Sequence, residues 1–119
     1  MEFIEYPKCS TCKKAKKYLQ ENNISFKERD ITKDTPTTTE LKHYLSLTKH
    51  HNINKFFNTS GLKYKELNLK EKINTMTEEE KISLLSRNGM LIKRPLLVGQ
   101  DFVIIGFKEA EYKQQSNIF

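Results

Sequence analysis

Residues 3–23 read FIEYPKCSTCKKAKKYLQENN, and this stretch decides the fold. Its first four residues, 3–6, form a short run that predicts a strand, which a proline ends. Ser10 or Thr11 is a typical N-cap for the helix that follows, because the apolar positions after them recur with helical spacing. The pair at 22–23 is Asn-Asn, and we expect the helix to stop there.

The rest of the chain extends this beginning into an α/β pattern. A second strand is expected around residues 25–29, so the chain opens as β-α-β with Cys9 in its first turn. It closes as β-β-α, with a hairpin over 96–105 and a helix over 108–115. Helical patterns fill the middle: a helix capped by one of the threonines at 37–39, short pieces over 52–57 and 64–69, and a helix from Thr77 to 88–89 that buries Ile82, Leu84 and Leu85.

Length and composition fit one compact domain. The chain has 119 residues, of which 36% are hydrophobic and 30% charged, and this length supports a core without disulfide staples. It has neither the ~20-residue apolar run of a membrane span nor the features of a signal peptide at its start. We therefore expect a cytoplasmic protein that does not bind membranes.

The net charge of +6 is spread along the chain. It allows attraction to acidic partners, but there is no basic tail, and we expect no direct contact with nucleic acid. The densest cluster lies beside the cysteines and is best explained as a solvated helix face; it consists of Lys13, Lys14, Lys16 and Lys17.

Cys9 and Cys12 are the only cysteines, and two residues separate them. A disulfide across so small a loop restrains the unfolded chain little, so the pair indicates redox chemistry or metal binding. Zinc would need two further ligands, and the histidines at 43, 50 and 51 lack finger-like spacing. We expect no metal and no cofactor; two incidental thiols are the remaining alternative.

The two thiols predict a division of labour. Cys9 comes just before a helix, where unpaired N–H groups and the helix dipole favour an anion. Lys8, Lys13 and Lys14 add positive charge nearby. Cys12 lies one turn further in and should be more buried. We expect Cys9 to attack as the nucleophile and Cys12 to resolve the mixed disulfide, which leaves a disulfide between them.

Arg94-Pro95 is the second element of interest. The proline is either an ordinary strand-start proline or a cis-proline packed beside the cysteines. Arg94 is either a surface charge or a guanidinium that holds an oxyanion or a thiolate near Cys9.

Three motifs resemble the arsenate reductase-like ArsC/Spx family, and within it the YusI-like branch. They are YPKCSTCKKA at 6–15, NTSG with YKELNL at 58–69, and LIKRPL with VIIGF at 91–107. The resemblance implies a thioredoxin-like fold with an inserted helical subdomain. It implies one domain over 1–119, with a thioredoxin-like part over about 1–33 and 91–119 and an insertion over about 34–90. It also implies a cis Pro95.

The resemblance implies two kinds of activity. The glutaredoxin-linked arsenate reductases of the family use one cysteine at the Cys9 position and three arginines that bind the oxyanion. Arg94 matches one of the three; Asn58 stands at the second, and Gly106 or Phe107 at the third. Losing those donors weakens binding of a doubly charged oxyanion.

Spx-like members use a CxxC redox switch and bind the α-subunit of RNA polymerase. They carry a glycine after the first inserted helix, where this chain has KHHNIN at 49–54. Three functions are therefore open: a thiol–disulfide oxidoreductase, a redox-sensing regulator that binds the polymerase α-subunit, and an arsenate reductase. In the first, Cys9, Cys12 and Arg94 carry the chemistry, while Lys8, Ser10, Thr11 and Pro95 shape the site. Thioredoxin, or glutathione with glutaredoxin, is expected to supply the electrons.

Overall fold

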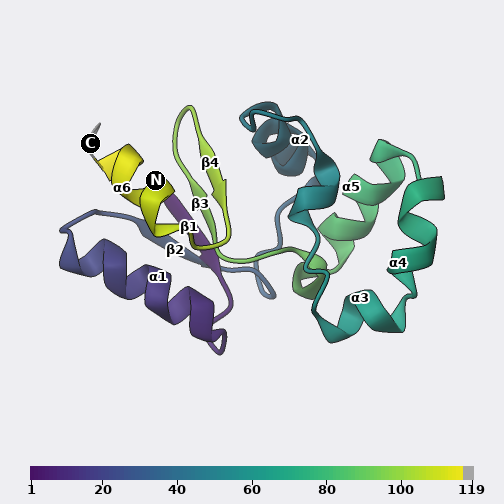
Figure 1. Cartoon of the computed structure of the whole chain (residues 1–119), viewed down its shortest axis with the longest axis horizontal. Helices are drawn as coiled ribbons and strands as arrows, with labels where there is room; N and C mark the ends of the chain where they lie inside the picture. Colours follow the sequence, from purple (N-terminus) through teal and green to yellow (C-terminus); the bar gives the residue numbers. More distant parts are fainter. Residues whose placement is uncertain (117–119) are drawn as a thin grey trace. The chain divides into compact units, whose positions relative to one another are not determined.

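The computed structural model describes residues 1–116 and divides into two compact units. The sheet unit holds Met1–Asp30 together with residues 94–116, and the helical unit holds Ile31–Lys93. Both units are drawn in Figure 1. The domain boundaries expected near residues 33 and 91 stay a prediction.

The sheet unit contains four strands in the order β2-β1-β3-β4 (Figure 1). They are β1 (Glu2–Glu5), β2 (Lys27–Asp30), β3 (Leu96–Val98) and β4 (Val103–Ile105). The central strand β1 runs parallel to β2 and antiparallel to β3, and β3 is antiparallel to β4. The parallel pair needs a crossover, which the helix α1 (Ser10–Glu21) supplies. The expected α/β order β-α-β … β-β-α is confirmed.

One face of this sheet carries the core of the unit. Alternate residues of a strand point to opposite faces, and Phe3 lies in the same cluster as residues from α1 and from the C-terminal helix α6 (Glu109–Ser116). Both helices therefore cover the Phe3 face. The buried members of the cluster are Phe3, Ala15, Leu19, Leu97, Ile104 and Tyr112. Each large side chain buried here contributes about 1.5–3 kcal/mol to folding.

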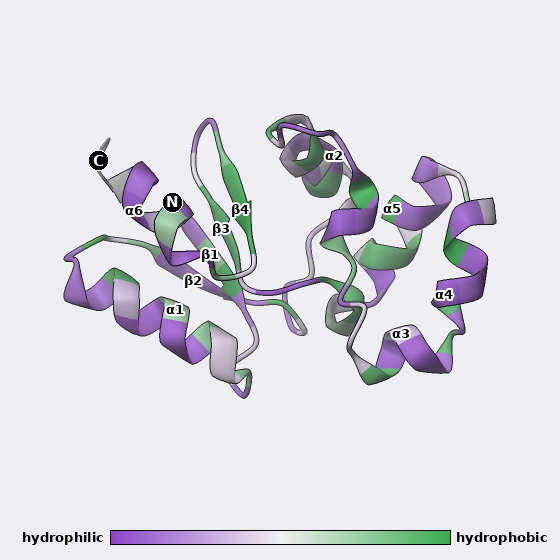
Figure 2. Cartoon of the chain, viewed as in Figure 1, coloured by the Kyte–Doolittle hydropathy of each residue, from purple (hydrophilic) through white to green (hydrophobic). Residues whose placement is uncertain are grey.

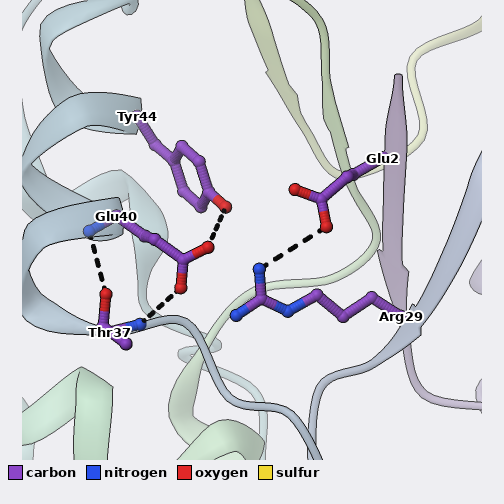
Figure 3. A network of polar contacts seen from close by, with 5 residues as sticks. All are labelled: Glu2, Arg29, Thr37, Glu40 and Tyr44. Carbon is purple, nitrogen blue, oxygen red and sulfur yellow. Dashed lines mark hydrogen bonds and ion pairs between the residues drawn. The ribbon is translucent and has the colours of Figure 1, made fainter.

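The opposite face carries Ile4 and Arg29, which are paired in register across β1 and β2. Arg29 is buried, and its Nη1 lies 3.5 Å from Oε2 of Glu2 on the neighbouring strand (Figure 3). The same alternation places Glu5 and Glu28 on the Phe3 face, beneath α1, because Phe3 pairs with Glu28 and Glu5 with Asp30.

The helical unit consists of short helices joined by tight turns. Thr37 and Thr77 each cap the helix that follows them, in a capping box with the glutamate three residues later. Figure 3 shows the first of these boxes, in which Glu40 also accepts a hydrogen bond from the Tyr44 hydroxyl at 3.4 Å. The elements are α2 (Thr38–Ser46), η1 (Ile53–Phe56), α3 (Leu62–Glu66), α4 (Leu69–Lys72), η2 (Ile73–Thr75), α5 (Glu78–Arg87) and η3 (Gly89–Leu91).

Two expectations about the helices were wrong. The N-cap of α1 is Cys9, which has extended backbone angles, while Ser10 and Thr11 already lie inside the helix. On α5, Leu84 is only half-buried, unlike Ile82 and Leu85. Those two residues are three apart and share a face, whereas Leu84 points away from it at 100° per residue.

Hydropathy follows the same division of faces. Figure 2 shows β3 and β4 as largely hydrophobic, while α1 shows hydrophilic bands between its apolar positions. Over residues 1–116, no helix is both long and apolar enough to cross a membrane.

Candidate functional site

A tight turn brings Cys9 to the N-terminus of α1. Its N–H donates to the carbonyl of Tyr6 at 2.9 Å, which closes the turn between β1 and the helix. The backbone N–H of Cys12 donates to Sγ of Cys9 at 3.4 Å. The thiol thus occupies the position of a capping side chain, where the helix dipole favours negative charge.

Several groups act on the Cys9 thiol. Partial burial is the strongest single influence and alone would raise its pKa. Hydrogen bonds from the side chain and backbone of Cys12 and from the backbone of Thr11, together with the charge of Arg94, outweigh burial and leave the pKa of Cys9 below its ordinary value. Cys9 is half-buried, so this thiol remains accessible to a reaction partner.

The Cys12 thiol has the opposite character. It is fully buried, and this burial is the main reason why its pKa is raised to about 12. A backbone hydrogen bond from Tyr6 lowers the pKa, while the negative charges of Cys9 and Glu5 raise it. The two thiols are free rather than joined in a disulfide. An accessible, acidified thiol therefore stands one turn from a buried thiol that keeps its proton.

Arg94 and Pro95 lie beside this turn. The Arg94 guanidinium stacks over the Tyr6 ring, with Cζ 5.4 Å from the ring centroid, a favourable cation–π arrangement. The Arg94–Pro95 peptide bond is cis, as the resemblance implies, and Pro95 is buried. The Pro95 carbonyl accepts a hydrogen bond from Gly106 at 2.8 Å, and Gly106 has a positive φ of 79° that favours glycine.

The remaining predicted site residues lie at the rim. Lys8, Ser10 and Thr11 precede or open α1 and are exposed, as is Lys13. Among the groups that act on the pKa of Cys9, the cation is Arg94 rather than one of the lysines. Over the described residues, no group of three or more His, Cys, Asp or Glu side chains is placed to hold a metal ion.

Two positions at which the resemblance to arsenate reductases predicts oxyanion-binding arginines hold other residues in this chain. Phe107 packs its ring 5.0 Å from that of Tyr112 and 5.9 Å from that of Tyr18, as part of the apolar core. Asn58 lies in the helical unit, where its N–H donates to the Leu91 carbonyl at 2.7 Å.

The sequence assigned no role at the site to Glu5, Lys16 or Glu28. Glu5 ends the central strand with only 4% of its surface exposed, and its pKa is raised, chiefly by burial and then by a hydrogen bond with Glu28. Lys16 reaches both carboxyls from α1. A detectable signal existed, because Glu5 is two residues from Phe3 and so shares its buried face.

Comparison with known proteins agrees with this fold and these motifs. Residues 4–115 match the ArsC family. YusI of Bacillus subtilis, an uncharacterized protein, is 47% identical over 96% of both chains, and the regulatory protein MgsR of the same organism is 38% identical over 93% of this chain and 86% of its own. The crystal structure of an ArsC-family-related protein from Bacteroides fragilis superposes with a TM-score of 0.91 at 54% identity, covering 95% of this chain and 94% of that one. The chain therefore belongs to the ArsC family and has its thioredoxin-like fold.

Proposed function

We propose that this protein is a thiol–disulfide oxidoreductase whose redox centre is the Cys9–Cys12 pair. The observation that carries the proposal is the contrast between the thiols: Cys9 is accessible with a lowered pKa, while Cys12 is buried with a pKa of about 12. The thiolate is the attacking species in disulfide exchange. A pair of this kind therefore has one thiol that can attack a disulfide and a second thiol that stays protonated until the resolving step.

The reaction runs in two exchanges. The Cys9 thiolate attacks one sulfur of a substrate disulfide, forms a mixed disulfide and releases the other substrate thiolate. Cys12 then loses its proton and attacks Sγ of Cys9, which releases the second substrate thiolate and leaves a Cys9–Cys12 disulfide. An external dithiol or thiol, thioredoxin or glutathione with glutaredoxin, reduces that disulfide again. Such a cycle suits the reducing cytoplasm.

The residues around the pair support the first exchange. Arg94 contributes positive charge that favours the Cys9 thiolate, and the Tyr6 ring holds the guanidinium in place. Pro95 is buried beside Arg94, with its carbonyl hydrogen-bonded to Gly106, so this strand start is firmly positioned. Lys8, Ser10 and Thr11 form the exposed rim that a substrate would meet first.

The test is a turnover assay on a mixed glutathione disulfide, with thioredoxin and glutaredoxin as separate electron donors. We expect turnover with at least one donor, loss of turnover in Cys9→Ser, and a stalled mixed disulfide in Cys12→Ser. Lys17→Gln is a matched control, because Lys17 is exposed on the same helix and its ion pair with Glu21, at 3.8 Å, lies at the surface. Equal activity of wild type and Cys9→Ser would refute the proposal.

A redox-sensing regulator is the second candidate, favoured by the 38% identity to a protein described as regulatory. In this case the same thiol pair would control binding to the α-subunit of RNA polymerase. A pull-down of that subunit by the reduced and by the oxidised protein separates the two functions. Binding that depends on the redox state supports the regulator, and its absence, with turnover in the first assay, supports the enzyme.

Arsenate reduction is the third candidate and the weakest. Arg94 is the arginine beside Cys9, while Phe107 belongs to an aromatic cluster and offers no charge. One guanidinium contributes a charge-assisted contact of about 1.5–3 kcal/mol, which is small against the hydration that a dianion gives up on entry.

A further inference from the structure

The two exchanges leave one buried carboxyl of the sheet unit without a role. Glu5 is 4% exposed at the end of the central strand, and strand alternation puts its side chain on the face that α1 covers. Buried carboxyl groups are costly unless they are paired or hydrogen-bonded. The burial of a carboxyl in this position therefore requires a compensating contact or a function.

Glu5 belongs to a small cluster of charged groups. Lys16 Nζ lies 3.9 Å from Oε2 of Glu5 and 2.8 Å from Oε1 of Glu28, and the Glu5 and Glu28 side chains are joined by a hydrogen bond. Asp30, the register partner of Glu5 on β2, adds a further negative charge. Glu28 is about half exposed, so the cluster leads from the buried carboxyl to solvent.

Helix geometry places Lys16, and with it this cluster, next to Cys12. Cys12 and Lys16 are four residues apart on α1, so they are neighbours along one face of the helix. Lys16 contacts Glu5, and the negative charge of Glu5 is one of the influences that raise the pKa of the Cys12 thiol. The buried thiol and the buried carboxyl therefore share the space between the first two turns of α1 and the sheet.

We propose that Glu5 accepts the proton of Cys12 in the resolving step, and that Glu28 and Lys16 set the pH at which it does so. This rests on the proposed oxidoreductase function, because it assigns the step in which Cys12 becomes a nucleophile. Glu28 and Lys16 act through Glu5 and are positioning residues.

Atoms and charge are conserved in this step. In the mixed disulfide, Glu5 is a carboxylate and Cys12 a thiol. The proton moves from Cys12 Sγ to the Glu5 carboxylate, and the Cys12 thiolate attacks Cys9 Sγ. The new Cys9–Cys12 bond forms as the bond from Cys9 to the substrate sulfur breaks, and the substrate leaves as a thiolate. The two cysteine sulfurs are oxidised, and the substrate sulfurs have taken up the electron pair.

This transfer avoids a build-up of charge. A thiolate at Cys12 beside a carboxylate at Glu5 would place two negative charges in one buried space, which is why Glu5 raises the pKa of Cys12. Moving the proton from Cys12 to Glu5 keeps the total charge of the two groups constant. The protonated Glu5 is then stabilised by its hydrogen bond to the Glu28 carboxylate, whose own pKa is lowered by its hydrogen bond with Lys16.

The experiment separates the two exchanges in time. The reduced protein is mixed with one equivalent of a chromogenic aryl disulfide, and release of the coloured thiolate is followed by stopped flow. The attack of Cys9 releases the first thiolate, and the attack of Cys12 releases the second. General base catalysis of the second release contributes roughly 100-fold or more, so we expect Glu5→Gln to slow that phase by about this factor at neutral pH.

The pH profile of the second phase carries the finer prediction. In the wild type its rate should rise with pH as Glu5 loses its proton. Glu28 raises the pKa of Glu5 and Lys16 lowers it, so Glu28→Gln should shift the midpoint down and Lys16→Met should shift it up. A purely structural role would not produce opposite shifts. Glu21→Gln, an exposed carboxylate on the same helix, is the control and should leave both phases unchanged.

Each outcome decides one question. Absence of the first phase, or of the second phase in the wild type, refutes the oxidoreductase function itself. Two normal phases with a second phase that Glu5→Gln leaves intact refute only the role of Glu5. If Glu5→Gln does not fold, the opposite shifts of Glu28→Gln and Lys16→Met support the proposal, and unshifted or parallel profiles overturn it.

Discussion

The buried Cys12 thiol should make the reduced protein unstable at alkaline pH. Folding raises its pKa from 9.0 to about 12, chiefly by burial. Below pH 9 the thiol is protonated in both states, and its full contribution to stability is present. Above pH 9 the unfolded chain ionises while the folded protein does not, so stability falls at about 1.4 kcal/mol per pH unit until the pH approaches 12.

The expected loss is about 2 kcal/mol between neutral pH and about pH 10.5, from the linkage of proton binding to unfolding. It depends little on the folded pKa, provided that this lies well above 10.5. The measurement is urea denaturation under reducing conditions at both pH values. Cys9→Ser is compared with the double variant Cys9→Ser/Cys12→Ala, because removing Cys9 prevents a disulfide and eliminates its own titration. Parallel losses in the two proteins, within about 0.5 kcal/mol, would refute the burial of a protonated Cys12 as the structure has it.

Three further predictions concern single side chains. In a Cys12→Ser background, the rate of alkylation against pH should give a pKa for Cys9 below that of a free cysteine, and Arg94→Met should raise that pKa. Tyr6→Leu should raise the pKa of Cys9 more than Tyr6→Phe, because phenylalanine keeps a ring under the guanidinium. The Tyr112 hydroxyl is buried without a hydrogen-bond partner among the described residues, so Tyr112→Phe should raise the free energy of unfolding by about 1 kcal/mol in urea denaturation, and a clear loss would contradict this. Arsenite formation from arsenate should be slow beside disulfide reduction by the same preparation; fast turnover that both Cys9→Ser and Arg94→Ala abolish would overturn that expectation.

Much of the fold was predictable because its signals are local. Thr37 and Thr77 are each followed by a glutamate three residues later, and both form capping boxes where the sequence predicts helix starts. The hairpin of β3 and β4 follows from two apolar runs around a glycine-containing turn. The N-cap of the first helix is not predictable in this way, because serine and threonine are far commoner N-caps than cysteine. Only the turn closed by the hydrogen bond from Cys9 to the Tyr6 carbonyl shows that the helix is capped by Cys9.

The surroundings of the cysteines were predictable only in part. The order of Cys9 and Cys12 along a helix predicts which thiol is more buried, and the structure agrees. The contact between Arg94 and the Tyr6 ring joins residues far apart in the chain and depends on tertiary structure. The meeting of Glu5 with Glu28 depends on the register of β1 against β2, since a slip of one residue would put Glu28 on the other face.

The most direct test of the central claim is mass spectrometry of the protein after exposure to oxidised glutathione. We predict a monomer that has lost two hydrogens, through a disulfide between Cys9 and Cys12, and we predict that Cys12→Ser stops with one glutathione attached to Cys9. A wild-type protein that accumulates glutathione adducts, intermolecular dimers or sulfonic acid instead would contradict the claim that these two cysteines form one redox centre.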